Sequence, residues 1–296
     1  MDNEQSIFDK KDAYQPLVKN AKKKSLKRTI LVSTGVMAGI LIILGIVITT
    51  LYFVMERSMG AYQEIKMEQD IVYGANIQLD HSTGSYGIDS ILMQDQYIKD
   101  IDGVPYTWYN EQTWFRLYDK ATTVFDNSIS SLDNERYYRN GQRVVNFYIP
   151  NGENHEDDRN QVQSLAPDSV VELALSFSGP MSPEEMKKKF PNAQWAWVQH
   201  PDSIHGSGRV IGDYAYGFTL TKKGITKDVE YFQKVLNSLS KKVEKDTRVT
   251  PLLQSIKEKG RLEVSGVIVT GTVQELLPLV EKEDVKYVSL GVVLPY

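Results

Sequence analysis

The sequence predicts a protein of the α+β class. We expect a single N-terminal transmembrane helix, then an extracytoplasmic region with a β-rich part and a C-terminal β-α-β mixed-sheet domain. Three observations predict this: a long uncharged apolar run, short β-prone segments separated by turn residues, and a last third where alternating and helical periodicities succeed each other. The expected parts are a basic tail, a membrane helix, a stalk with the β-rich part, and the α+β domain, at residues 1–28, 29–55, 56–165 and 166–296.

The apolar run extends from Thr29 to Met55 and contains no Asp, Glu, Lys or Arg. At about 1.5 Å per residue, a helix of this length is long enough for a hydrocarbon core of about 30 Å. A cleavable signal peptide is the competing interpretation, since Ser58-Met59-Gly60 resembles a cleavage site. Its apolar core would be far shorter, so the sequence favours a membrane span.

The charges beside the span predict its orientation. Residues 1–28 hold eight Lys or Arg and four Asp or Glu, whereas the whole chain has a net charge of −4. Because cytoplasmic flanks carry the excess of Lys and Arg, we expect a plasma-membrane protein with a cytoplasmic N-terminus and an extracytoplasmic C-terminal part. The acidic exported part argues against nucleic acid as a partner. The basic cluster, interpreted first as a topology signal and second as a contact for anionic lipids, comprises Lys19, Lys22, Lys23, Lys24, Lys27 and Arg28.

Gly35 and Gly39 lie four residues apart within the span. Such a pair lets two membrane helices approach closely, so a homodimer through this helix is one interpretation. The alternative is that glycine is simply common in membrane helices.

The exported part begins with a helical stalk expected over residues 56–71 and ends in elements of both periodicities. In the β-rich part, strands are expected at 72–80, 105–109, 113–118 and 144–150. A polar, solvated loop is expected at 151–161. Beyond it we expect strands at 170–177, 193–199, 213–220, 264–272 and 285–295. Helices are expected from Ser182-Pro183, over 227–243, over 251–259 and over 273–282.

No catalytic or cofactor constellation stands out. The chain has no cysteine and four histidines, and it lacks a metalloprotease helix, a nucleophile elbow and a phosphate-binding loop. His200 and His205 share one loop and a metal there is conceivable, but a solvated loop is the better interpretation. We therefore expect no enzyme activity, no cofactor and no metal.

Aromatic residues gather in two places. Tyr106, Trp108 and Tyr109 belong to a cluster that ends near residue 118, and Trp195 and Trp197 share one face of a strand. A pocket or partner surface is one interpretation, while packing in the core is favoured because large aromatics fill cores in any fold.

The last 31 residues carry a resemblance to a known family. The run GVIVTGTVQELLPLVEKEDVKYVSLGVVLPY at 266–296 resembles the end of the sigma factor regulator C-terminal domain, found in membrane-bound anti-sigma factors of Gram-positive bacteria. The segment 170–198 is similar to the start of that domain. Residues from the span to about Trp114, including Ala75-Asn76 and the run YIKDIDGVP at 97–105, resemble the companion N-terminal domain.

The resemblance implies a regulator that holds an extracytoplasmic-function sigma factor at the membrane and couples it to an exported sensor domain. A tail of 28 residues is too short to fold alone, so it would fold on its partner. The partner would be a sigma factor or a small membrane co-regulator. The expected apolar contacts are Ile7, Phe8, Tyr14, Leu17 and Val18. Two alternatives stay open: an envelope-binding module without a role in transcription and, last, a tethered envelope enzyme.

Overall fold

The computed structural model describes residues 11–87, 89–116, 120–131, 136–150, 152, 155–201, 208–243 and 249–295. The chain divides into two compact units, one up to Arg57 and the other from Ser58 to Tyr296. The predicted α+β class is confirmed, because a long apolar helix is followed by a β-rich region with several antiparallel sheets. The expected domain boundaries stay a prediction.

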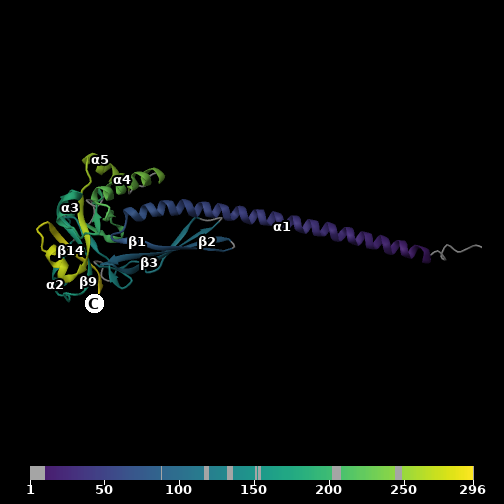
Figure 1. The fold of residues 1–296 in the computed structure, drawn as a ribbon, viewed down its shortest axis with the longest axis horizontal. Helices are drawn as coiled ribbons and strands as arrows, with labels where there is room; N and C mark the ends of the chain where they lie inside the picture. Colours follow the sequence, from purple (N-terminus) through teal and green to yellow (C-terminus); the bar gives the residue numbers. More distant parts are fainter. Residues whose placement is uncertain are drawn as a thin grey trace, which may run out of the picture. The chain divides into compact units, whose positions relative to one another are not determined.

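Helix α1 (Lys11–Val72) contains both the predicted span and the predicted stalk (Figure 1). Among the described residues, it is the helix that is long and apolar enough to cross a membrane, which fits a single-pass membrane protein. The chain turns after α1, where Gly74 and Asn76 have φ angles of 83° and 57°. The strand expected at 72–80 therefore begins only at Ile77.

The β-rich part is built on a four-stranded antiparallel sheet in the order β1-β2-β3-β4. Its strands are β1 (Ile77–Tyr86), β2 (Ser90–Ile101), β3 (Val104–Arg116) and β4 (Thr122–Phe125). The two strands expected at 105–109 and 113–118 form the single strand β3. Strand β2 was not predicted, because Asp95 and Lys99 interrupt its apolar pattern, yet both side chains are buried.

Short strands extend this part of the fold. Strands β5 (Ser130–Ser131), β6 (Tyr137–Arg139) and β7 (Gln142–Arg143) form an antiparallel sheet. Strand β8 (Asn146–Tyr148) pairs with β11 (Arg209–Ile211), which lies some sixty residues later in the chain. The 3-10 helix η3 (Gly212–Tyr214) follows β11 directly.

The C-terminal part centres on a five-stranded sheet in the order β12-β10-β13-β9-β14. Its strands are β9 (Val170–Met181), β10 (Trp195–Trp197), β12 (Gly217–Thr219), β13 (Val264–Thr272) and β14 (Val285–Leu294). Every pair of neighbours is antiparallel. The expectation of a mixed sheet was wrong, although the β-α-β connections that prompted it are present.

Both connections skip one position in the sheet. Strands β9 and β10, joined by α3 (Pro183–Lys189), run in the same direction with β13 between them. Strands β13 and β14, joined by α6 (Val273–Val280), likewise flank β9. Two interlocked split β-α-β units of this kind make a ferredoxin-like arrangement, in which parallel strands are never neighbours.

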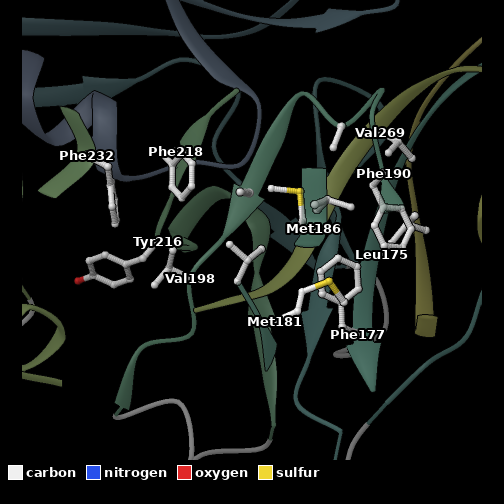
Figure 2. Close-up of a cluster of buried hydrophobic side chains, with 14 of the residues drawn as sticks. Leu175, Phe177, Met181, Met186, Phe190, Val198, Tyr216, Phe218, Phe232 and Val269 are labelled. Carbon is white, nitrogen blue, oxygen red and sulfur yellow. The ribbon is translucent and has the colours of Figure 1, made fainter. Parts of the chain in front are cut away.

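One face of this sheet is covered by helices. Alternate residues of β9, including Leu175 and Phe177, pack against Met186 of α3, Phe190 and residues of α6 (Figure 2). The rings of Phe177 and Phe190 stack with centroids 5.0 Å apart. Helices α4 (Ile225–Lys242) and α5 (Val249–Lys259) add Phe232 and other apolar residues to the same core. The predicted cap of α3 is confirmed, because the Ser182 hydroxyl accepts a hydrogen bond from the backbone N–H of Glu185.

The opposite face is also buried, but under strand β8 rather than under helices. Trp195, Trp197 and Ile268 form a second core with Val145 and Phe147. The Phe147 ring stacks on Trp197 with centroids 4.8 Å apart and an interplanar angle of 17°. These tryptophans therefore pack in the core, as the sequence favoured, and the sheet is sandwiched between two apolar layers.

The segment expected as a solvated loop at 151–161 is partly buried. Asp158 accepts hydrogen bonds from the backbone N–H of Leu290 and from Arg143, and its own N–H donates to the Val288 carbonyl. The short helix α2 (Arg159–Gln163) begins next to it. The expectation of a solvated loop was wrong at this end, because Asp158 forms hydrogen bonds with backbone groups of β14. Nothing in the sequence around Asp158 indicates these contacts.

Candidate functional site

The last turns of α1 carry polar residues at a spacing of four, which places them on one face of the helix. Tyr62 donates a hydrogen bond to Glu111 Oε1 at 3.0 Å, and Lys66 Nζ lies 3.0 Å from Glu111 Oε2. Asp70 lies 3.4 Å from Lys66 and accepts a hydrogen bond from the Tyr97 hydroxyl at 2.9 Å. This face of α1 is therefore bound to strands β2 and β3 by charged and hydrogen-bonding groups.

A second face of α1 is bound to helix α4. Lys242 Nζ lies 2.6 Å from Glu64 Oε1 and 2.7 Å from Glu68 Oε1. The Ser238 hydroxyl donates a hydrogen bond to Glu68 at 2.8 Å. Because Glu64 and Glu68 are two positions on from Tyr62 and Lys66, they project from the other side of the helix. The end of α1 is thus fixed from both sides.

A fully buried ion pair joins β2 to the central sheet. Lys99 Nζ lies 3.0 and 2.9 Å from the two carboxylate oxygens of Glu172, and neither side chain is exposed to solvent. The Asn76 amide donates to Glu172 at 3.4 Å and to the backbone carbonyl of Asp100 at 2.8 Å. The Lys99 ammonium also lies 4.3 Å from the centre of the Trp108 ring.

The Lys99–Glu172 pair is connected to the residues around α1 through Trp108, Asp213 and Arg139. The Trp108 indole N–H donates to both Asp213 carboxylate oxygens, at 3.1 and 3.0 Å. Asp213 pairs with Arg139, whose guanidinium lies over the Tyr109 ring at 4.4 Å. Tyr109 stacks on Tyr97 with centroids 4.6 Å apart, which completes the path to Asp70.

We call this unbroken series of contacts the polar network. It links α1 to β2, β3, β6, η3 and β9 through ion pairs, hydrogen bonds and ring contacts. Its members are Glu111, Lys66, Asp70, Tyr97, Tyr109, Arg139, Asp213, Trp108, Lys99 and Glu172.

A cavity of about 1000 Å³ opens beside the middle of the polar network. Its walls include Asp70, Tyr97, Arg139 and Asp213, with Tyr214 at η3 largely exposed. Pockets of this size are typical of sites for small molecules. A smaller cavity of about 320 Å³ also borders Asp70, so two cavities meet the end of α1.

Burial shifts the pKa values of acidic groups in this site. Burial raises the pKa of Asp213, although the positive charges of Lys99 and Arg139 act against it. Burial likewise raises the pKa of Asp70, with Lys66 and the Tyr97 hydrogen bond opposing the change. Burial also raises the pKa of Tyr97 and of Tyr109, so both hydroxyls stay protonated at neutral pH.

The raised pKa of Asp213 predicts a pH dependence of stability. An aspartate whose pKa rises on folding contributes its full stabilisation of the folded state when the pH is below its unfolded pKa of about 3.9. This contribution to the unfolding free energy is lost as the pH rises through the pKa of the folded state. Between about pH 4 and pH 7 we therefore expect the wild type to lose more unfolding free energy than Asp213→Asn. Urea unfolding at several pH values measures this difference. The control is Asp126→Asn at an exposed position, and equal pH slopes for wild type and Asp213→Asn would contradict the prediction.

The structure does not bring the sequence-predicted site residues into this site. Tyr14, Leu17 and Val18 are exposed on α1, as is the basic cluster from Lys19 to Arg28. Ile7 and Phe8 lie outside the described residues. Gly35 and Gly39 lie on α1, and a Cβ added at either would meet nothing within 4 Å. Their proposed partner and dimer contacts stay predictions, because the structure contains one chain.

The metal interpretation of the histidine loop gains no support. Within the described ranges, no group of three or more acidic or histidine side chains is placed to hold a metal ion. His200 stacks on Tyr216 with ring centroids 4.9 Å apart, and residues 202–207 lie outside the described ranges.

The fold and site define a class: a ferredoxin-like α+β domain joined by a buried polar network to the end of a helix that can span a membrane. Residues 162–292 match the family model of the sigma factor regulator C-terminal domain. The resemblance stated for the C-terminal region is therefore confirmed, while the companion N-terminal domain stays a prediction. Comparisons with curated proteins and with solved structures found no match.

Proposed function

We propose that this chain is a single-pass membrane regulator of an extracytoplasmic-function sigma factor. In this proposal the N-terminal tail lies in the cytoplasm and holds the sigma factor directly or through a small membrane co-regulator. Residues from Ser58 onward form the exported sensor. The matched family is one of sigma factor regulators, which supports a regulatory rather than an enzymatic role. The basic cluster before the span supports the orientation.

The observation that carries the proposal is the continuity of α1. One helix extends from Lys11 to Val72, so the segment that carries the exposed tail residues also carries Lys66 and Asp70. The exported domain holds those two residues through the polar network. A change in the exported domain that alters these contacts acts on the same helix that would enter the membrane. The helix is therefore the proposed route from sensor to tail.

The test is a pulldown from detergent-solubilised membranes with the full chain and with a chain lacking residues 2–22. We expect a sigma factor to co-purify with the full chain and to be lost with the deletion, because the tail supplies the contacts. A full-length variant with Tyr14→Ser, Leu17→Ser and Val18→Ser keeps the basic cluster and is expected to weaken the capture. Equal recovery of cytoplasmic proteins with all three chains would contradict the proposal.

The deletion needs a control for membrane orientation. The shortened chain keeps Lys23, Lys24, Lys27 and Arg28, so its orientation is expected to survive. The chain has no cysteine, so a single Lys222→Cys substitution at an exposed position gives one site for a membrane-impermeant thiol reagent. Labelling of intact cells in both chains shows that the exported part is outside. If neither the full-length chain nor the shortened chain is labelled in intact cells, the proposed orientation with the C-terminal part outside is wrong.

An envelope-binding module is the second candidate, and the large cavity favours it. This function would survive deletion of residues 2–22, which separates it from regulation through the tail.

A further inference from the structure

One residue that lines the cavity beside the polar network has an unsatisfied donor. Arg139, at the end of β6, is buried and lines the cavity. Its Nε lies 3.0 Å from Asp213 but is not aligned for a hydrogen bond, and its Nη1 has no hydrogen-bond partner among the described residues. Nη1 is closed to solvent, and a buried charged donor without an acceptor is costly, so a shift of this guanidinium toward a ligand oxygen in the cavity would be favourable.

The charges of the cavity wall balance. Its described lining includes two cations, Lys66 and Arg139, and two carboxylates, Asp70 and Asp213. Each cation already pairs with a carboxylate of the same wall. A strongly charged ligand would meet an opposing charge wherever it met a favourable one. The wall therefore favours a ligand without net charge that both donates and accepts hydrogen bonds.

Tyrosine rings supply the rest of the wall. Tyr97 and Tyr109 form the stacked pair behind it, and Tyr73 and Tyr216 form a second pair with centroids 4.6 Å apart. Tyr214 is 62% exposed. Aromatic rings with polar edges suit a ligand that has an apolar face and a polar rim. A sugar ring has this character, because its C–H groups form a face and its hydroxyls lie around the edge.

We propose that this cavity binds a neutral saccharide. A hydroxyl or N-acetyl oxygen of the sugar accepts a hydrogen bond from the Arg139 guanidinium, and sugar hydroxyls donate to Asp213 or Asp70. The exposed ring of Tyr214 covers one face of the sugar. Binding itself does not depend on the proposed function; only its consequence for the tail rests on it, because Asp70 belongs to α1.

The test uses the full chain in detergent and N,N′-diacetylchitobiose as the probe, with binding measured by isothermal titration calorimetry. The wild type is expected to bind. Tyr214→Ala, at an exposed position, is expected to weaken binding roughly tenfold, because it removes a stacking face without opening the core. Arg139→Lys keeps the charge beside Asp213 but loses the planar fork of donors, and it is also expected to weaken binding roughly tenfold.

The matched control is Tyr86→Ala, a tyrosine of similar exposure on β1 that does not line the cavity. It is expected to bind like the wild type. No binding to the wild type, or equal loss with Tyr86→Ala and Tyr214→Ala, would overturn the proposal. Binding of alanyl-alanine, a zwitterionic dipeptide, in place of the sugar would also overturn it. None of these readouts involves a sigma factor, so failure here is distinct from failure of the tail to capture one.

Discussion

Lys99→Met is expected to destabilise the part of the chain from Ser58 onward by about 3–5 kcal/mol, because it leaves the Glu172 carboxylate charged and unpaired in a site closed to solvent. Both side chains are fully buried, so Glu172 has no solvent to replace the lost partner. The Asn76 amide, at 3.4 Å, is too weak a donor to compensate. The substitution keeps an unbranched apolar stem of similar length, so the lost stability comes mainly from the missing positive charge.

Removing both charges separates pairing from packing. Lys99→Met with Glu172→Leu is expected to recover most of the loss, since a buried ion pair replaced by apolar residues is often close to neutral. The measurement is urea unfolding of the full chain in detergent, with limited proteolysis as the readout. It is made on the wild type, the two single variants and the double variant, which together form a double-mutant cycle. Arg261→Ala is the control: it removes an exposed arginine that pairs with the half-buried Glu263, with an expected loss below about 1 kcal/mol. A Lys99→Met loss as small as that of Arg261→Ala would show that water reaches Glu172.

Trp197→Ala is expected to cost about 3–5 kcal/mol by leaving a cavity between the sheet and strand β8. Trp197 is buried, and its ring lies parallel to that of Phe147 at 4.8 Å. The space cannot collapse easily, because β8 is held in place by its pairing with β11 and by the Ser176 hydroxyl, which accepts from the Tyr148 N–H at 2.9 Å. The same unfolding assay measures the loss.

Trp114→Ala is the matched control for Trp197→Ala. Trp114 lies on β3 and is only half-buried, so its truncation leaves a smaller unfilled space and is expected to cost clearly less. Similar losses at the two positions would mean that tryptophan content, rather than the stack on Phe147, sets the stability.

The cavity and the helix share residues, which gives the two proposals a common physical basis. Asp70 belongs to α1 and lines the cavity, where it pairs with Lys66 and accepts from Tyr97. A sugar hydroxyl that donates to Asp70 competes with Tyr97 for the same carboxylate. Together the proposals predict that ligand binding changes how firmly the last turn of α1 is held.

Local pattern was enough for much of the fold. The uncharged run from Thr29 to Met55 predicted a helix that is long and apolar enough to span a membrane, because helices of globular proteins rarely extend so far without a polar face. Strand β13 matches its predicted range, and Ser182 caps its helix as expected. These features depend on the periodicity of apolar residues and on hydrogen bonds between residues close in the sequence, so a short segment is enough to predict them.

The site depended on contacts between distant residues. The spacing of four between Lys66 and Asp70 was visible in the predicted stalk and was the one signal that could have marked a partner-facing side. Nothing near Lys99 indicates that its partner is Glu172, and nothing near Arg139 indicates a cavity with Asp213 on its wall.

By itself the sequence determined the long apolar helix, the α+β class and the resemblance of the C-terminal region, since each depends on composition or on a pattern within one segment. Only the tertiary structure decided the antiparallel order of the central sheet, the burial of Lys99 with Glu172 and the cavity beside α1. Strand order and ion pairing are set by packing free energies summed over the whole domain, which no single segment encodes.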